Sequence, residues 1–127
     1  MGVCIRNIIG VKCMYDLETP PEPLDLKREA IAKARSKEWS FIGRESTIKF
    51  FTLGSQGLPK YLWNYWKPAL KAMKVSWQLF LRVISACEYD VIAWVEGKRN
   101  WEELVSIVLK VLRRAREGKY PLWPPSD

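Results

Sequence analysis

Hydrophobic positions in the second half of the chain repeat with the period of a helix. Between residues 60 and 96 apolar side chains recur at steps of three and four, which places them on one face of an amphipathic helix. Pro68 either starts this helix or kinks it. Residues 89–95 continue the helix, which the pattern favours, or form a short buried strand, because they are β-branched and aromatic. The apolar face comprises Leu70, Met73, Trp77, Phe80, Ile84, Cys87 and Val91.

A last helix is predicted over residues 101–117. Asn100 followed by Glu103 has the spacing of a capping box, and Gly118 suits a helix C-terminus. We expect this helix to pack antiparallel against the helix at 60–96. Its inward positions would be Leu104, Val108, Val111 and Ala115.

The first half has weaker patterns. Asp25 is a candidate N-cap for a helix that runs to about Trp39. Its apolar stripe is thin and consists of Leu26, Ala30, Ile31 and Ala34. Residues 47–53 are β-prone in composition but alternate poorly. Residues 54–59 indicate a loop, and Pro59 suits the first position of a following helix.

Both ends of the chain are rich in proline. Residues 1–24 are interpreted as an arm, because the prolines at 20, 21 and 23 favour extended backbone. The arm packs on its own domain or reaches a neighbouring subunit, and the sequence leaves both alternatives open. Residues 25–127 are interpreted as one domain, whose tail is 118–127. The expected fold class is mainly α, an antiparallel helix pair or small bundle, with α+β and a strand at 89–95 as the alternative.

Composition argues against several kinds of chemistry. Histidine is absent, so no Ser-His-Asp triad, Cys-His pair or histidine metal ligand exists. Cys4, Cys13 and Cys87 are widely spaced and are interpreted as small buried hydrophobes, with one disulfide as an alternative. Asp25-Leu26-Lys27 and Glu96-Gly97-Lys98 have the acid-x-Lys shape of a nuclease strand, but no second carboxylate is fixed beside either. We therefore expect no enzyme, no cofactor and no metal. The apolar run to Val11 is too short for a signal peptide or membrane span, which predicts a soluble chain, inside a cell or packaged.

Positive charge is concentrated in one part of the sequence. The chain has 21 Lys+Arg against 14 Asp+Glu, a net charge of +7, and residues 53–85 contain five basic and no acidic residues. Steps of four, three, four and four place a row on one side of the predicted helix, about 22 Å long at 1.5 Å per residue. Like charges at these steps repel, and a polyanion would turn that repulsion into attraction. The row is Lys67, Lys71, Lys74, Gln78 and Arg82.

Nucleic acid is the polyanion that we predict, because basic side chains that neutralise phosphates release counterions. The expected surface also includes Lys110, Arg113 and Arg114 of the last helix, and Arg28, Lys33 and Arg35 of the first. Two alternatives are a solvated face that only aids solubility and a helix that lies on a membrane surface. Trp63, Tyr65 and Trp66 belong to the core or a subunit contact, or they stack on bases.

Three motifs follow one another in the second half: residues 77–82 (WQLFLR), residues 89–95 (YDVIAWV) and residues 116–121 (REGKYP). This succession resembles the C-terminal half of CRISPR-associated RecB-type nucleases, which have a Gln-x-x-x-Tyr helix, a strand, and a last helix before a Gly-x-x-Pro-like run. Gln78 is present, but Arg82 stands in place of the tyrosine. No Asp…Glu-x-Lys pair precedes Gln78, and no cysteine cluster follows the last helix. The resemblance therefore implies an inactive relative.

A short, basic, tryptophan-rich chain of this kind is similar to the nucleocapsid proteins of filamentous viruses of hyperthermophilic archaea, the tristromavirus group. The resemblance implies a capsid subunit that wraps double-stranded DNA in an A-like form. It also implies copies of itself and a paralogous subunit as partners, in a virion assembled in the host cytoplasm, with no direct membrane contact. The alternatives are a small DNA-binding accessory or regulatory protein, in which Gln78 and Asn64 read bases, or a degenerate nuclease.

Overall fold

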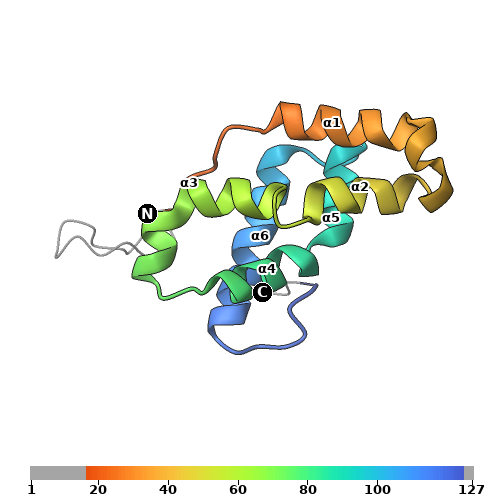
Figure 1. Cartoon of the computed structure of the whole chain (residues 1–127). Coiled ribbons are helices and arrows are strands. Elements are labelled where there is room, and N and C mark those ends of the chain that lie inside the picture. Colours follow the sequence, from red (N-terminus) through yellow and green to blue (C-terminus); the bar gives the residue numbers. More distant parts are fainter. Residues whose placement is uncertain (1–16, 125–127) are drawn as a thin grey trace.

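The computed structural model describes residues 17–124, and every regular element in this range is a helix (Figure 1). The fold is a small, mainly α bundle, as predicted. Residues 89–95 lie in a helix, so the alternative with a strand there is wrong. The elements are α1 (Leu24–Arg35), the 3₁₀-helix η2 (Lys37–Ile42), α2 (Arg44–Leu53), α3 (Leu58–Ala72), α4 (Trp77–Ala86), α5 (Glu88–Val95) and α6 (Trp101–Arg116).

The single helix expected over 60–96 is instead three helices, α3, α4 and α5. Helix α3 ends where Lys74 adopts a left-handed conformation (φ 61°), and Val75 N–H donates to the Leu70 carbonyl over 3.0 Å. Ser76 then caps α4, because its Oγ accepts from Leu79 N–H over 3.1 Å. Cys87 separates α4 from α5. The predicted inward face survives both breaks: Leu70, Met73, Phe80, Ile84, Cys87 and Val91 are buried, and Trp77 is half-buried.

Helix α6 packs against α4 and α5, which are two of the three helices that replace the predicted 60–96 helix (Figure 1). Its capping box is complete: Glu103 N–H donates to Asn100 Oδ1 over 2.8 Å, and Asn100 N–H donates to Glu103 Oε1 over 3.1 Å. Gly118 ends the helix with a φ of 71°. The four residues expected to face inward, Leu104, Val108, Val111 and Ala115, are all buried.

The helix predicted over 25–39 is shorter than expected. Helix α1 begins at Leu24, so Asp25 lies in its first turn and Pro23 occupies the N-cap position. The helix ends at Arg35 because Ser36 is extended and accepts a hydrogen bond from Glu38 N–H, which starts the 3₁₀-helix η2. Helix α1 packs mainly on α2.

The β-prone segment at 47–53 is part of helix α2. Ile48 is fully buried, and so are two threonines, Thr47 and Thr52. Their hydroxyls donate to the carbonyls of Gly43 (2.6 Å) and Ile48 (2.7 Å), four residues earlier. These bonds satisfy the buried hydroxyls within the helix, so the burial of one face outweighs the local β preference.

Between α2 and α3 the chain turns tightly at Gly57. A Cβ atom there would lie 2.7 Å from the Thr52 carbonyl oxygen, so this turn requires glycine. Pro59 is the second residue of α3, close to the predicted first position.

The described part of the N-terminal arm packs on its own domain. Residues 17–23 run extended past α3 towards α1 (Figure 1). Aromatic side chains of α3, α5 and α6 donate hydrogen bonds to them. The bonds are Trp66 Nε1 to Glu18 O (2.7 Å), Trp101 Nε1 to Pro20 O (2.6 Å), Trp94 Nε1 to Glu22 Oε2 (2.8 Å) and Tyr61 Oη to Pro21 O. Residues 1–16 of the predicted arm, with Cys4 and Cys13, lie outside the described residues.

The described part of the C-terminal tail, residues 118–124, also lies on the domain. Leu122 is buried, and Arg114 of α6 donates through Nη2 to the Pro121 carbonyl over 2.6 Å. Trp123 donates its indole N–H to Asp90. Within residues 17–124 no helix is long and apolar enough to cross a membrane.

Candidate nucleic-acid interface

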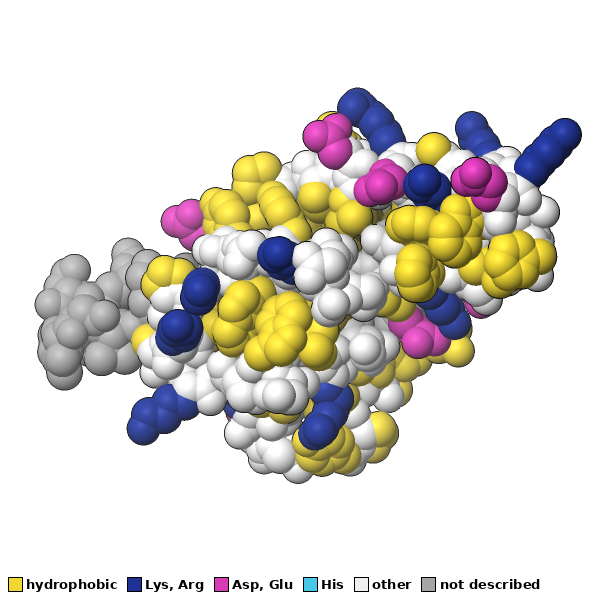
Figure 2. All heavy atoms as spheres, viewed as in Figure 1, with side chains coloured by type: hydrophobic (Ala, Val, Ile, Leu, Met, Phe, Trp, Pro, Cys, Tyr) yellow, Lys and Arg dark blue, Asp and Glu magenta, His cyan; other side chains and the backbone are white. Residues whose placement is uncertain are grey.

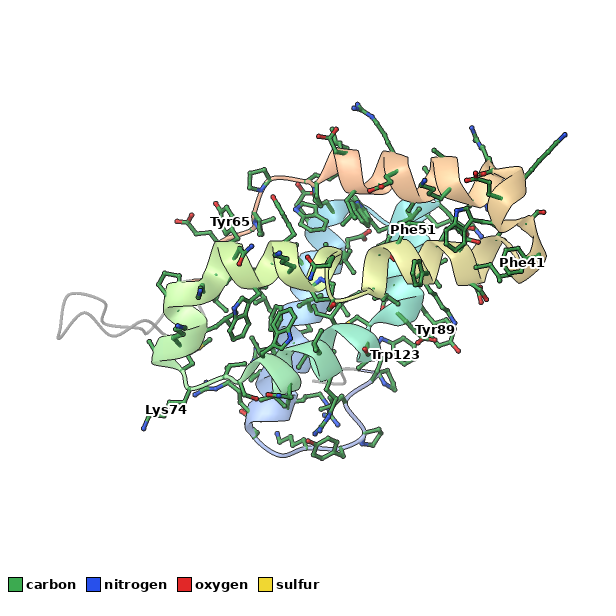
Figure 3. All side chains as sticks on the ribbon, viewed as in Figure 1. Phe41, Phe51, Tyr65, Lys74, Tyr89 and Trp123 are labelled. Carbon is green, nitrogen blue, oxygen red and sulfur yellow. The ribbon has the colours of Figure 1, made fainter. Side chains whose placement is uncertain are left out.

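Helices α3 and α4, with the turn that joins them, form a surface that carries basic and no acidic side chains. Lys67 and Lys71 lie on α3, Lys74 lies in the turn, and Gln78 and Arg82 lie on α4; all five are exposed. Figure 2 shows lysine and arginine side chains over these two helices without carboxylates among them, and Figure 3 shows Lys74 projecting from the turn. We call these five residues the α3–α4 basic surface.

The cations of this surface have no carboxylate within 4 Å in the described part of the chain. Several lysines elsewhere do have one: Lys49 lies 3.2 Å from Glu88, Lys98 3.7 Å from Glu96 and Lys119 3.1 Å from Glu117. The Glu88 hydrogen bond raises the pKa of Lys49. The charge of the α3–α4 basic surface is therefore available to an external anion.

The surface spans two helices, which corrects the expectation of one straight row about 22 Å long on a single helix. Lys67 and Lys71 belong to one helix, Gln78 and Arg82 to the next, and Lys74 stands at the corner. The protein thus presents two short basic rows, one on each helix.

Lys74 stands at the corner in a conformation that normally favours glycine. Helices α5 and α6 end in the same kind of turn, and they place Gly97 (φ 79°) and Gly118 (φ 71°) at the equivalent position. A non-glycine residue there costs about 1 kcal/mol. Among the described residues Lys74 is the one non-glycine with a positive φ. A cation therefore occupies a backbone conformation that glycine would adopt with less strain.

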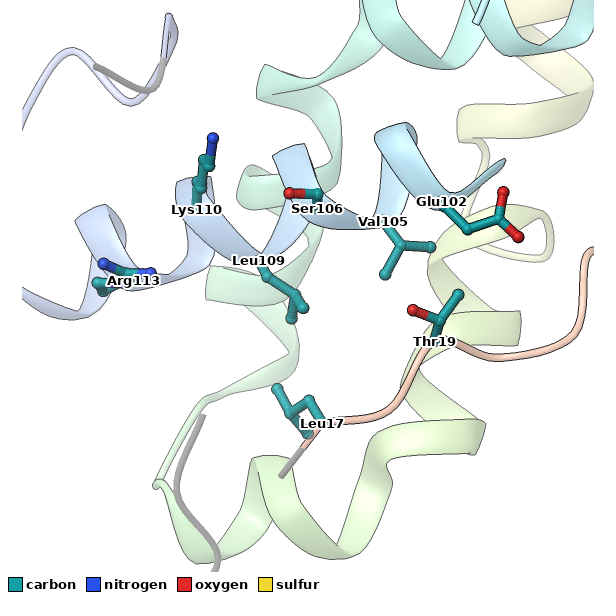
Figure 4. Close-up of a pocket in the computed structure, with 8 residues that line it drawn as sticks. All are labelled: Leu17, Thr19, Glu102, Val105, Ser106, Leu109, Lys110 and Arg113. Atoms are coloured by element: carbon teal, nitrogen blue, oxygen red, sulfur yellow. The ribbon is translucent and has the colours of Figure 1, made fainter. Parts of the chain in front are cut away.

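The basic residues predicted on α6 belong to other parts of the surface. Lys110 and Arg113 line a cavity of about 280 Å³ beside the start of the described chain (Figure 4). Lys110 is exposed, whereas Arg113 is half-buried and already has an interaction partner. Arg114 is half-buried and holds the Pro121 carbonyl. The cavity is lined by Leu17, Thr19, Glu102, Val105, Ser106, Leu109, Lys110 and Arg113.

The basic residues predicted on α1 are not on the α3–α4 basic surface either. Arg28 lies 3.7 Å from Asp25, and the Lys33 ammonium lies 5.8 Å from the centre of the Phe51 ring on α2. Arg35 is exposed in the last turn of α1. Of the eleven predicted residues, five lie exposed on α3, α4 and the turn between them, and we restrict the candidate interface to those five.

The three aromatic residues that precede the basic row have different environments. Trp66 is buried and bonded to the N-terminal segment, so it belongs to the core. Tyr65 is 44% exposed. Trp63 is half-buried, with its ring centre 5.3 Å from that of Trp77 and 5.6 Å from that of Phe80. Trp63 and Trp77 were not predicted to pair at the surface, although the spacing of Trp63 from Lys67 indicates a shared face.

The described residues hold no acidic group arranged for metal chemistry. Asp25 is fully exposed, and Glu96 pairs with Arg44 (3.3 Å) and Lys98. No three His, Cys, Asp or Glu side chains in residues 17–124 lie close enough to hold a metal ion. Burial, with a smaller effect of Asp90, raises the pKa of the Cys87 thiol to about 12, so this thiol is neutral near neutral pH.

Comparisons of the chain with protein-family models, curated proteins and solved structures found no match.

Proposed function

We propose that this protein is a structural nucleoprotein that binds double-stranded DNA through the phosphate backbone. The α3–α4 basic surface carries the proposal, because its cations are exposed and are not neutralised by carboxylates of the described chain. The proposal includes assembly into a helical filament with copies of itself and a paralogous subunit, as a viral nucleocapsid.

Counterion release makes the proposal quantitative. Each phosphate that the protein neutralises contributes a slope of about −0.9 to a plot of log affinity against log salt concentration. The surface has four cations, Lys67, Lys71, Lys74 and Arg82, so full engagement gives a slope of about −3 to −4 per subunit.

Sequence-independent binding follows from the side chains of the surface. Phosphate contacts position a protein but do not read bases. Gln78 on α4 and Asn64 on α3, both exposed, are the uncharged polar side chains that we expect to be able to read base edges. A regulatory protein that binds particular sites would need more such contacts. We therefore expect random duplexes to compete as well as any selected sequence.

A salt series in filter binding tests the proposal, with a random duplex and the full chain. The variant with Lys67→Gln, Lys71→Gln and Arg82→Gln should bind less tightly and with a slope reduced by about 2 to 3. The matched control, Lys98→Gln with Lys119→Gln, removes lysines that already pair with carboxylates and should reduce the slope by less than 1. An affinity that is the same at low and high salt would exclude phosphate-led binding.

Assembly is a separate part of the proposal. Phe41 is 79% exposed and Phe50 is 60% exposed, and the Phe50 ring stacks on Trp39 with centres 5.6 Å apart. Exposed apolar groups of this size favour contact between subunits. Electron micrographs of the protein with and without DNA should show regular filaments with DNA. Isolated particles under both conditions would contradict filament assembly and leave DNA binding standing.

A further inference from the structure

The tryptophans fall into two groups according to their indole N–H groups. Trp66, Trp94, Trp101 and Trp123 each donate to an oxygen of a distant segment over 2.6–2.8 Å. Trp39, Trp63 and Trp77 have no acceptor among the described residues, and all three are half-buried. Because these side chains reach the surface, their donors are available to a partner.

Two of these three indoles, those of Trp63 and Trp77, lie on the helices that carry the α3–α4 basic surface. On α3, Trp63 follows Lys60 by three residues and precedes Lys67 by four, so the three side chains share one face. Trp77 is the first residue of α4, next to Gln78, and its ring packs edge-to-face against Trp63. Figure 2 shows hydrophobic side chains between α3 and α4, with lysine and arginine side chains around them.

The packing of the pair limits how it can contact a ligand. Trp63 packs against both Trp77 and Phe80. The two indole rings are therefore held in place by the core and do not project from the surface. Wedges that kink a duplex must insert between base pairs. Rings held in the surface can instead make apolar contact with the sugars of the backbone, and their N–H groups can donate hydrogen bonds to backbone oxygens.

We propose that Trp63 and Trp77 contact the sugar–phosphate backbone of bound duplex DNA, between phosphates that the surrounding cations neutralise. This inference depends on the proposed function. The cations contribute the part of the DNA affinity that depends on salt concentration. The indole pair contributes a part that does not. A variant of the pair should therefore lower affinity equally at all salt concentrations, whereas a lysine variant changes the slope.

The test combines Trp63→Phe with Trp77→Phe, which keeps aromatic packing but removes both N–H donors and part of each ring. With a random duplex, we expect affinity to fall about fivefold to tenfold at every salt concentration, with an unchanged slope. The matched control is Trp39→Phe, because Trp39 also has no acceptor among the described residues but lies in the Phe50–Phe51 cluster. The control should bind within twofold of the unaltered chain.

Thermal unfolding identifies folded variants, and Trp77→Phe alone repeats the test if the double variant is unstable, because Trp77 contacts one ring rather than two. An affinity within twofold of the unaltered chain overturns the inference, and so does a changed slope. A loss on single-stranded DNA only also overturns it, because that result indicates base stacking. If the unaltered chain itself does not bind duplex, the proposed function fails; if only the tryptophan effect is missing, this inference alone fails.

Discussion

Trp123 donates its indole N–H to Oδ2 of Asp90 over 2.8 Å, which joins the C-terminal segment to helix α5. The other oxygen of the same carboxylate, Oδ1, lies 3.2 Å from Arg99 Nε, an ion pair whose alignment is too poor for a hydrogen bond. Asp90 is only 4% exposed. One buried carboxylate therefore holds both the turn before α6 and the segment after it.

This relationship predicts unequal effects for the two partners. Trp123→Phe removes one hydrogen bond at a partly exposed site and should lower the free energy of unfolding by about 1 kcal/mol. Asp90→Ala also leaves Arg99 without its counter-charge and should cost about 3 kcal/mol. Urea denaturation measures both. Equal losses would show that the Arg99 contact contributes nothing.

Lys74→Gly should separate stability from binding. Glycine relieves the left-handed backbone but adds freedom to the unfolded chain, so stability should stay unchanged or rise by up to about 1 kcal/mol. DNA affinity should fall, with a salt slope smaller by about 1.

The control for that variant is Lys71→Gly, in the last turn of α3. It removes an equivalent charge but should lower stability by about 1 kcal/mol, because glycine disfavours helix. Thermal unfolding and filter binding measure the two properties. If Lys74→Gly destabilised the protein as much as Lys71→Gly, the proposed backbone cost at Lys74 would be wrong.

Trp101→Phe should loosen the N-terminal segment. It leaves the Pro20 carbonyl without its donor in a buried position, at a cost of about 1–3 kcal/mol. Trp63→Phe removes an indole with no acceptor among the described residues and should cost less than 1 kcal/mol. Chemical denaturation and limited proteolysis near residue 20 would detect the difference. Similar stability in both variants would contradict a clamping role for Trp101.

Cys87 should make stability fall at alkaline pH. Its pKa of about 12 in the folded protein exceeds the usual 9.0, because burial disfavours the thiolate. The unfolded chain therefore loses its thiol proton first, so this contribution to stability is complete below pH 9 and is lost progressively between pH 9 and pH 12.

The free energy of unfolding, measured from pH 8 to pH 11, should fall less steeply with pH in Cys87→Ala than in the unaltered chain. In a Cys4→Ser/Cys13→Ser background, Cys87 should also resist thiol reagents at pH 8 until the protein unfolds. Rapid labelling of the folded protein would contradict this environment.

Helix positions in the second half were largely predictable from the sequence. The capping box of α6 and the inward side chains of α4 and α6 followed from spacing, because a buried face repeats with the helical period. The breaks at Lys74 and Cys87 did not follow. The apolar steps of three and four continue across both breaks. At the first break the residue with a left-handed backbone is Lys74, whereas a glycine there would have signalled the end of a helix.

The candidate site was predicted in part, for a similar reason. Exposure of Lys67, Lys71 and Arg82 followed from their spacing away from the apolar face. The hydrogen bond from Arg114 to the Pro121 carbonyl could not be predicted, because it depends on where the segment after α6 packs on the domain. The free donors of Trp63 and Trp77 were equally hidden, since all seven tryptophans look alike in sequence.

The sequence by itself determined that this chain is helical, that one face of each late helix is buried, and that residues 53–85 carry positive charge without acids. These properties are local, because they depend on the order of residue types along a helix. Only the tertiary structure decided where α3 ends, which described indoles have acceptors and which described cations remain without a carboxylate. Those properties depend on contacts between segments up to 81 residues apart, such as Pro20 with Trp101, which no local pattern encodes.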